Sequence, residues 1–423
     1  MYSQEELVRL RRQIHQYPEP GWCEFVTTIR LVNRLLPMGL EVLTGTKVIN
    51  PQFIAGRNPE QVEKFYNKAR EQGITDIELQ SLEGYTGCVA ILRTGRPGPT
   101  VAIRFDIDCV EVQESSEPTH RPAKEGWAST NEGCMHSCGH DAHQTIGIGV
   151  CSWLSDHREQ LCGTIKVLFQ PAEEGVRGAR PMAESGILDD VDYFFANHIG
   201  VGVPNGTITA MPGLFLASKK IDVEFFGKAS HAGADPQEGK NALLAAATAA
   251  LGINGIPRHG KGMSAVNVGT LHAGQGRNVI APNATMQLEV RGQTEEINSF
   301  MYQEAVQRVN GAAQMYGCTA KIKLAGEAGE FKPDAKAIEL AEKAAEEVVG
   351  KENIWKGSVN MGSEDATILL ARVQKHGGIG TYVVFGTALK AGHHQKNFDI
   401  DENVLSTGVR FYEKLIKELC WKK

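Results

Sequence analysis

Residues 135–143 read Met-His-Ser-Cys-Gly-His-Asp-Ala-His, and a helix-like apolar run, Ala142–Leu154, begins inside them. A strand-like run, Thr100–Asp106, comes earlier in the chain and ends two residues before Asp108. One thiol, three imidazoles and one carboxylate within nine residues exceed what a hydrophobic core needs. They are the side chains that bind transition-metal ions. The stretch therefore predicts a junction that leads into a helix and carries metal ligands.

The chain alternates strand-like and helix-like runs on both sides of this junction. Further strands are expected at Gly87–Leu92, Thr164–Phe169, Tyr193–Asn197 and Thr381–Phe385. Further helices are expected at Gln4–Tyr17, Thr27–Leu36, Ala335–Val349, Ser363–Arg372 and Asn403–Leu419. This alternation indicates an α/β fold with a mostly parallel sheet. Residues 43–75 form an excursion from the pattern, in which Glu60–Gln72 reads as a polar helix.

The middle of the chain follows a different order. Its expected elements are strand Ala217–Phe226, helix Asn241–Gly252, strands Ser264–His272 and Ala284–Arg291, helix Glu295–Tyr316 and strand Thr319–Leu324. This β-α-β-β-α-β order is the ferredoxin-like arrangement, and turn-rich segments flank it. We therefore predict a smaller domain, residues 215–328, inserted into an α/β domain made of residues 1–214 and 329–423.

Composition argues against several classes of protein. At 423 residues the chain is too long for one ordinary core, so two domains are expected. A net charge of −6 argues against a broad basic surface, and hence against nucleic acid as a partner. No apolar run reaches the roughly 20 residues that span a bilayer, and the acidic N-terminus lacks a signal-peptide pattern. The nine irregularly spaced cysteines favour reduced thiols and a cytoplasmic protein.

Metal-type side chains follow several predicted strands, namely Asp106, Asp108, Glu173, Glu174, His198 and His394. Cys138 and His140 precede the helix that starts near Ala142. In open α/β sheets, sites form beyond the carboxyl ends of the strands, so these side chains are expected to meet at one edge. Taken singly, each has an ordinary alternative, such as a buried thiol, a core histidine or a solvated turn. Their convergence predicts a two-metal hydrolase.

Three motifs carry a family resemblance: Arg104-Phe105-Asp106-Ile107-Asp108, the stretch 135–143, and Phe169-Gln170-Pro171-Ala172-Glu173-Glu174-Gly175. Shorter segments add to them at residues 229–233, 241–247, 266–269, 276–279, 362–367, 382–387 and 391–394. Together they resemble the aminoacylase/carboxypeptidase family of metallo-amidohydrolases. The most similar branch contains plant auxin–amino-acid conjugate hydrolases and bacterial hippurate hydrolases. The resemblance spans almost the whole chain.

This resemblance implies a dinuclear metallopeptidase domain that binds two divalent ions, manganese or zinc, in each subunit. The implied ligands are Cys138, His140, Glu174, His198 and His394. Cys138 would bridge the two ions, and Glu173 would be the general base that takes a proton from the attacking water.

Two positions in this set need a choice. Many relatives outside the branch have a His-x-Asp motif where this chain has Asp106 and Asp108, so we expect Asp108 to orient His140 rather than to bind metal. His393 and His394 are adjacent, and only their register decides which one is the ligand. Phe398, four residues after His394, favours His394.

The resemblance also assigns the small domain a role as a lid and as the interface of a homodimer. His231 would reach the partner's active site and stabilise the tetrahedral oxyanion. Asn267 and Arg291 are candidates for binding the carboxylates of the substrate, because a guanidinium fork suits a carboxylate. Each of the three could also be an ordinary loop or surface group.

The expected reaction is hydrolysis of the amide bond of an N-aroyl or N-acyl amino acid. The resemblance is strongest to members that act on p-aminobenzoyl-glutamate, a folate breakdown product, which would yield p-aminobenzoate and glutamate. A broader N-acyl-amino-acid, hippurate or dipeptide hydrolase is the alternative. A third possibility is a supporting chain that is active only with a paralogous partner, since enzymes of this kind occur as pairs of related subunits.

Overall fold

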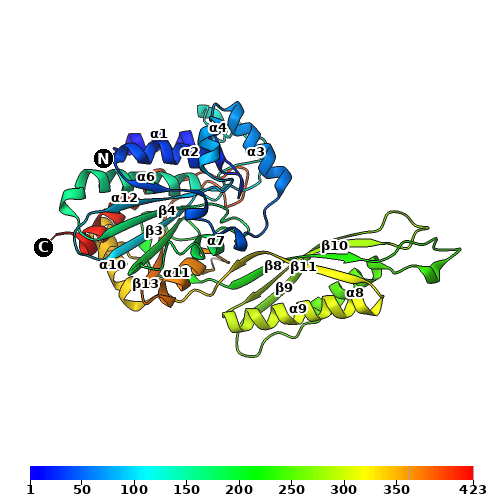
Figure 1. Ribbon diagram of the computed structural model, residues 1–423. Coiled ribbons are helices and arrows are strands. Elements are labelled where there is room, and N and C mark those ends of the chain that lie inside the picture. Colours follow the sequence, from blue (N-terminus) through cyan, green and yellow to red (C-terminus); the bar gives the residue numbers. More distant parts are fainter. Residues whose placement is uncertain (361, 423) are drawn as a thin grey trace. The chain divides into compact units, whose positions relative to one another are not determined.

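The computed structural model describes residues 1–360 and 362–422. The chain divides into two compact units. Figure 1 shows the ribbon coloured along the sequence, from blue at the N-terminus to red at the C-terminus. The α/β unit comprises Met1–Leu214, Lys332–Met361 and Asp365–Lys423, and the small unit comprises Phe215–Phe331 and Gly362–Glu364. Each unit has its own hydrophobic core, as a chain of this length requires.

A seven-stranded sheet organises the α/β unit, in the order β1-β2-β4-β3-β5-β13-β6. The strands are β1 (Glu41–Leu43), β2 (Cys88–Arg93), β3 (Thr100–Asp106), β4 (Thr164–Gln170), β5 (Tyr193–Ile199), β6 (Ile208–Thr209) and β13 (Ile379–Phe385). Neighbours among β4, β3, β5 and β13 pair in parallel, and β1, β2 and β6 pair antiparallel toward the edges. Consecutive residues of the central strands are buried, so both faces of the sheet are covered. The predicted α/β fold with a mostly parallel sheet is confirmed.

The helices of this unit pack against the sheet or against one another, and one of them begins at the predicted junction, beyond the carboxyl end of β3. They are α1 (Gln4–His15), α2 (Phe25–Leu35), α5 (Arg121–Glu125), α6 (His140–His157), α7 (Ala179–Ala183), α10 (Ala335–Val349), α11 (Ala366–Lys375) and α12 (Asn403–Cys420). α6 begins at His140, earlier than predicted, and Gly139 before it has a φ of 89°, which suits glycine. α11 begins at Ala366 rather than at Ser363, since residues 362–364 group with the small unit.

The excursion at residues 43–75 leads into a helical layer beside α2. It contains α3 (Pro59–Glu71), and α4 (Asp76–Ser81) follows directly. Each helix starts behind a side chain that caps its first N–H groups, Asn58 for α3 and Thr75 for α4. The apolar residues of this layer pack with the start of α2 in a separate small cluster.

In the described residues, no helix combines the length and the apolar character that crossing a membrane requires. All nine cysteines are free thiols.

The small unit is a four-stranded antiparallel sheet with two helices. Its elements are β8 (Ala217–Phe226), α8 (Ala242–Asn254), β9 (Ser264–Ala273), β10 (Asn283–Gly292), α9 (Glu295–Met315) and β11 (Thr319–Ala328). The strand order β11-β8-β10-β9 is that of the ferredoxin-like arrangement. Buried residues alternate with exposed ones along β10, because the helices cover only one face of the sheet.

Candidate active site

The candidate site lies in the α/β unit, where β3, β4 and β5 end and α6 begins. His140, the first residue of α6, has one ring nitrogen committed to a protein partner. Its Nδ1 lies 3.0 Å from the carbonyl oxygen of Asp108 and 3.2 Å from Asp108 Oδ1, so this nitrogen carries a proton and donates it. Its Nε2 is buried and has no hydrogen bond within the described residues. Nε2 lies 3.7 Å from Asp106 Oδ2 and 3.9 Å from Glu173 Oε2. An oriented imidazole of this kind fits a metal ligand.

The remaining donors lie around Cys138 in two groups. Cys138, His140 and His198 form one group, and Cys138, Glu174 and His394 form the other. Within each group the donor atoms all lie within 4.8 Å of one another. Both groups contain the sulfur of Cys138, so a thiolate there is able to serve two ions. The structure therefore brings the five ligands expected from the sequence together, with Glu173 beside His140 and Glu174.

His198, near the end of β5, is held in the same way as His140. Its Nδ1 lies 2.7 Å from the carbonyl oxygen of Ile199, and its Nε2 lies 3.5 Å from Cys138 Sγ. Burial, together with His143 and His393, holds the pKa of His198 well below its usual range. The ring is therefore neutral, which is the form of imidazole that binds metal.

Asp108 connects two of the donors. Its Oδ1 faces Nδ1 of His140, and its Oδ2 accepts the backbone N–H of Glu174 at 2.9 Å. The side chain is fully buried. One carboxylate therefore orients the ring of His140 and fixes the backbone that carries Glu174. This arrangement is typical of a residue that supports metal ligands through hydrogen bonds.

Asp106 and His143 are close to the donors but are engaged elsewhere. Asp106 pairs with Arg104 at 2.7 Å and with His143 Nδ1 at 2.5 Å. His143 Nε2 accepts the backbone N–H of Ile199 at 3.1 Å. Both ring nitrogens of His143 are thus in use, which makes it a poor ligand.

The adjacent histidines His393 and His394 point to different partners. His393 Nε2 accepts the backbone N–H of Val201 at 3.1 Å. Burial, His143 and His394 lower the pKa of His393 to about 4. His394 Nε2 instead lies 3.3 Å from Glu174 Oε1, and its backbone φ is 63°, a strained value outside glycine. The geometry thus places His394, and not His393, in the donor group.

Three buried residues that shape this site were not singled out from the sequence. Asp365 accepts the N–H groups of Gly178 and Ala179 at 3.1 and 3.0 Å, and its other oxygen lies 3.2 Å from Arg104. These bonds close the loop that follows the Glu173–Glu174 pair. Arg104 and Asp365 lie inside the quoted motifs, so their signal was present in the sequence.

Glu24 is the third of these buried residues, and it lies outside the sequence motifs quoted above. Its Oε1 accepts the backbone N–H of Ala172 at 2.7 Å, and its Oε2 accepts the hydroxyl of Thr86 at 2.6 Å. Ala172 directly precedes the glutamate pair and has a φ of 52°. Glu24 therefore holds the strained backbone from which Glu173 and Glu174 project.

The charge balance at the site calls for a cation. Burial alone would lower the pKa of His140, yet Asp106 and Asp108 raise it to about 10. Burial and the two glutamates raise the pKa of the Cys138 thiol well above its usual range. Carboxylates thus favour positive charge at His140 and oppose a thiolate at Cys138. Divalent ions would supply that charge and stabilise the thiolate, so the residues present fit a metal site.

The structure places the other three predicted residues in the small unit. His231 is exposed, and its Nδ1 accepts the N–H groups of Gly233 and Ala234 at 3.1 and 3.0 Å. Nδ1 is therefore the acceptor, so the proton of the neutral ring is on Nε2, which is a hydrogen-bond donor.

Arg291 and Asn267 lie on the face of the small sheet that the helices do not cover. Arg291 binds Glu289 through two hydrogen bonds of 3.0 and 3.1 Å. Asn267 stands opposite Glu289 in the register of β9 and β10, which makes it a diagonal neighbour of Arg291. The two candidate carboxylate-binding residues are thus close together, although the guanidinium already has an acidic partner.

Comparisons with known proteins agree with this geometry. The model of the peptidase family M20/M25/M40 matches residues 102–418. The chain is 46% identical to a homolog of a p-aminobenzoyl-glutamate hydrolase subunit from Haemophilus influenzae, with 98% of each chain covered. It is 43% identical to an indole-3-acetyl-aspartic acid hydrolase of Enterobacter agglomerans, over 99% of this chain and 97% of the other. A crystal structure of an aminobenzoyl-glutamate utilization protein from Klebsiella pneumoniae is similar with a TM-score of 0.83 and 37% identity, covering 98% of this chain and 95% of that one.

Proposed function

This chain belongs to the peptidase family M20/M25/M40 and is a hydrolase of amide bonds, and we propose that its substrate is p-aminobenzoyl-glutamate, cleaved to p-aminobenzoate and glutamate. The observation that carries the proposal is the donor set around Cys138, which includes Glu174, with Glu173 beside it. The substrate follows from similarity over nearly the whole chain to a relative named for this reaction.

The proposed cofactor is a pair of divalent ions, manganese or zinc, held by Cys138, His140, Glu174, His198 and His394. Support for two ions comes from the two donor groups that share Cys138. Mixed thiolate, imidazole and carboxylate donors suit either metal. When bound, the ions would polarise the scissile carbonyl and make a water molecule more acidic.

Glu173 is proposed as the general base. Its side chain is 13% exposed, so it lies inside the site and still reaches solvent. It accepts a proton from the attacking water and donates a proton to the leaving nitrogen. Glu174, next in sequence, has the different task of holding metal. The support for this division is positional, since the N–H of Glu174 is fixed by Asp108 and its Oε1 faces His394.

The small unit is proposed to act as a lid and dimer interface in a homodimer. His231 would donate its Nε2 proton to the oxyanion that develops in the partner's site. The tautomer supports this role, because the two backbone N–H groups on Nδ1 leave the proton on the outer nitrogen. Arg291 and Asn267 would bind the glutamate carboxylates of the substrate, with Arg291 exchanging Glu289 for the ligand.

Two alternatives remain part of the proposal. A broader N-acyl-amino-acid or dipeptide hydrolase is favoured by the 43% identity to a relative named for indole-3-acetyl-aspartic acid. A supporting role beside a paralogous partner is favoured by the names of two other relatives, each of which is called one subunit of a hydrolase or its homolog. The presence of every proposed ligand and of Glu173 argues that this chain is itself catalytic.

The deciding experiment measures hydrolysis of p-aminobenzoyl-glutamate by the purified chain. The protein is first chelated and then supplied with manganese or zinc, with indole-3-acetyl-aspartate, hippurate and N-acetyl amino acids as comparison substrates. We expect metal-restored turnover, fastest on p-aminobenzoyl-glutamate. Faster turnover of another conjugate would identify that conjugate as the substrate and leave the proposed reaction, amide hydrolysis, unchanged. No turnover of any conjugate until a paralogous chain is added would favour the supporting role.

A further inference from the structure

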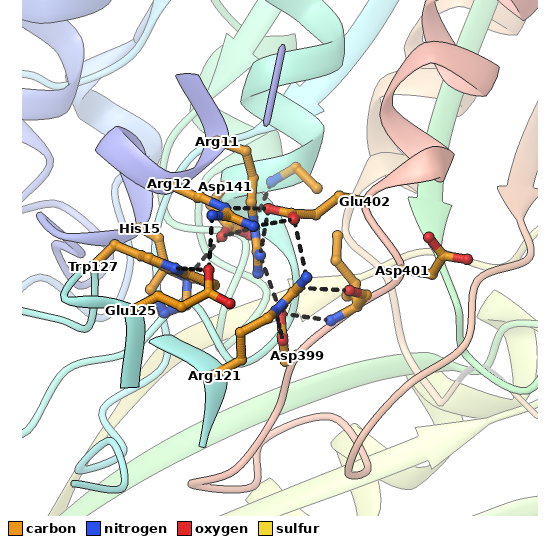
Figure 2. A network of polar contacts seen from close by, with 12 residues as sticks. Arg11, Arg12, His15, Arg121, Glu125, Trp127, Asp141, Asp399, Asp401 and Glu402 are labelled. Atoms are coloured by element: carbon orange, nitrogen blue, oxygen red, sulfur yellow. Dashed lines mark hydrogen bonds and ion pairs between the residues drawn. The ribbon is translucent and has the colours of Figure 1, made fainter. Parts of the chain in front are cut away.

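A buried guanidinium joins two segments that carry proposed metal ligands, and Figure 2 shows it from close by. Arg11, in α1, has no exposed surface. Its Nε lies 2.7 Å from Asp141 Oδ2, and its Nη1 lies 3.1 Å from Asp399 Oδ1. The same Nη1 lies 3.3 Å from Glu402 Oε1. One side chain therefore ties the first turn of α6 to the segment that leads into α12.

At one end of this bridge, Asp141 is the neighbour of His140. Its Oδ1 accepts the N–H of Ala142 at 2.9 Å. Its Oδ2 lies 2.7 Å from Arg11 Nε and 2.7 Å from His15 Nδ1. Both carboxylate oxygens are thus fixed, and the side chain is fully buried. Any displacement of Asp141 moves His140, because the two residues share the first helical turn.

At the other end, Asp399 closes the turn that carries His394. The backbone N–H of Lys390 donates to the carbonyl oxygen of Asp399 at 2.9 Å. At the tip of this turn, the N–H of His394 donates to the carbonyl oxygen of Ser137 at 2.9 Å. The positive φ of His394 requires support from its surroundings. Arg11 and Arg121 both attach this turn at its base, opposite the tip, and of the two Arg11 is the one that also contacts Asp141.

Two neighbouring arginines share the acidic partners but not the bridge. Arg12 pairs with Glu402 at 2.8 Å, and Arg121 pairs with Asp399 at 2.6 Å. No ion pair joins either of them to Asp141 within residues 1–360 and 362–422. Their side chains are 29% and 31% exposed, whereas that of Arg11 is not exposed at all. Substitution of Arg12 or Arg121 would therefore remove a positive charge but leave the contacts of Arg11 with Asp141 and Asp399 in place. Such variants are matched controls for substitutions of Arg11.

We propose that Arg11 is a positioning residue for the metal centre, which fixes His140 on α6 against the turn that carries His394. The inference rests on the proposed function, since that function supplies the ligand roles of both histidines. Residues that support metal ligands contribute about 10-fold to 100-fold in metal affinity. An arginine is required, because its planar guanidinium contacts Asp141 and Asp399 at once whereas an ammonium is a single point of charge.

The test compares Arg11→Lys and Arg11→Met with the control Arg12→Gln in the full-length chain. Circular dichroism and Tm establish folding, and calorimetric titration of chelated protein with Mn²⁺ and Zn²⁺ gives the number and affinity of bound ions. We expect Arg12→Gln to bind two ions with wild-type affinity. Arg11→Lys should bind at least one ion about 10-fold more weakly, with a lower kcat, a nearly unchanged KM and partial rescue by excess metal.

Three outcomes would overturn the inference. A folded Arg11→Lys with wild-type affinity for both ions is the first, and an equal loss in Arg12→Gln is the second. Failure of both Arg11 variants to fold is the third, since it would assign Arg11 to the fold as a whole. Failure of the proposed function has a different signature, namely a wild-type chain that binds no divalent ion at all.

Discussion

The two units of this protein hold their candidate functional side chains in opposite ways. In the α/β unit, His140 and His198 are buried, and one nitrogen of each ring is already committed to a protein partner. In the small unit, His231 is exposed, and Arg291 is bonded to the side chain of Glu289. A buried set is fixed before the substrate arrives, whereas an exposed side chain takes its final position from what it meets. We therefore expect substitutions in the α/β unit to lower metal affinity and kcat. Substitutions in the small unit should leave metal affinity unchanged.

The largest effect is expected from Glu173→Gln. The amide keeps the size of the side chain but cannot accept the proton of water, so kcat should fall by about 10³-fold to 10⁴-fold. Calorimetry should still find two bound ions, because Glu174 and not Glu173 is the proposed ligand. Loss of an ion in this variant would show that Glu173 is itself a ligand.

His231→Ala tests the exposed histidine of the small unit. Removal of one donor to a developing oxyanion typically lowers kcat by about 10²-fold to 10³-fold. Metal affinity should equal that of wild type, since His231 belongs to the small unit. If the histidine acts across a dimer, mixing His231→Ala with inactive Glu173→Gln should restore part of the activity through hybrid dimers. Unchanged kcat in His231→Ala would leave this residue as an ordinary loop histidine.

Asp108→Asn tests the α/β unit through a buried residue that is not among the proposed metal ligands. Its Oδ1 can still accept from His140, but its Nδ2 would face the N–H of Glu174, which Oδ2 now accepts at 2.9 Å. Two opposed donors should shift the Glu174 backbone, so metal affinity should fall by about 10-fold to 100-fold. Titration with Mn²⁺ measures this. Wild-type affinity would mean that His140 and Glu174 keep their positions without the carboxylate.

Arg291→Ala should act on substrate binding alone. Loss of a charged hydrogen bond to a carboxylate costs about 1.5 to 3 kcal/mol, so KM should rise at least 10-fold while kcat changes little. Glu289→Ala is the matched variant, because it removes the competing partner of Arg291. It should leave KM unchanged or lower it. A fall in kcat for Arg291→Ala would instead indicate a role in the transition state.

The sequence predicted the fold well because its strongest signals are local. Alternating strand and helix patterns located β3 and α10 at their observed bounds, and parallel strands bring their carboxyl ends to one edge. Cys138, His140, Glu174, His198 and His394 follow from that topology together with the family resemblance. The start of α11 was placed too early, since the N-cap of this helix is Asp365 and residues 362–364 group with the small unit.

The supporting residues could not be predicted from local pattern. Arg11 reads as one more charged residue of an amphipathic helix, yet its partners lie 130 and 388 positions away. Glu24 reads as a polar residue ahead of α2, and only the folded chain shows it bonded to Ala172. Burial of a charge is decided by tertiary contacts, which a single sequence does not display.

The smallest expected effect belongs to Glu24, and it concerns stability. Burial and the charge of Asp108 raise the pKa of Glu24 from 4.5 to about 8. The folded chain therefore keeps a proton that the unfolded chain releases, so this contribution to stability is complete below pH 4.5 and is lost as the pH rises through 8. Glu24→Gln imitates the protonated side chain, because its oxygen can accept from Ala172 while its amide donates to Thr86.

The Tm of the metal-free wild type should consequently fall more steeply between pH 5 and pH 8 than that of Glu24→Gln, by about 2 °C. The two melting curves are compared at each pH, so that titration of all other groups cancels. Parallel behaviour would show that Glu24 is ionised in the folded chain. In that case the two bonds to Ala172 and Thr86 stabilise a buried carboxylate, and the loop before Glu173 is held by charge rather than by a neutral hydrogen bond.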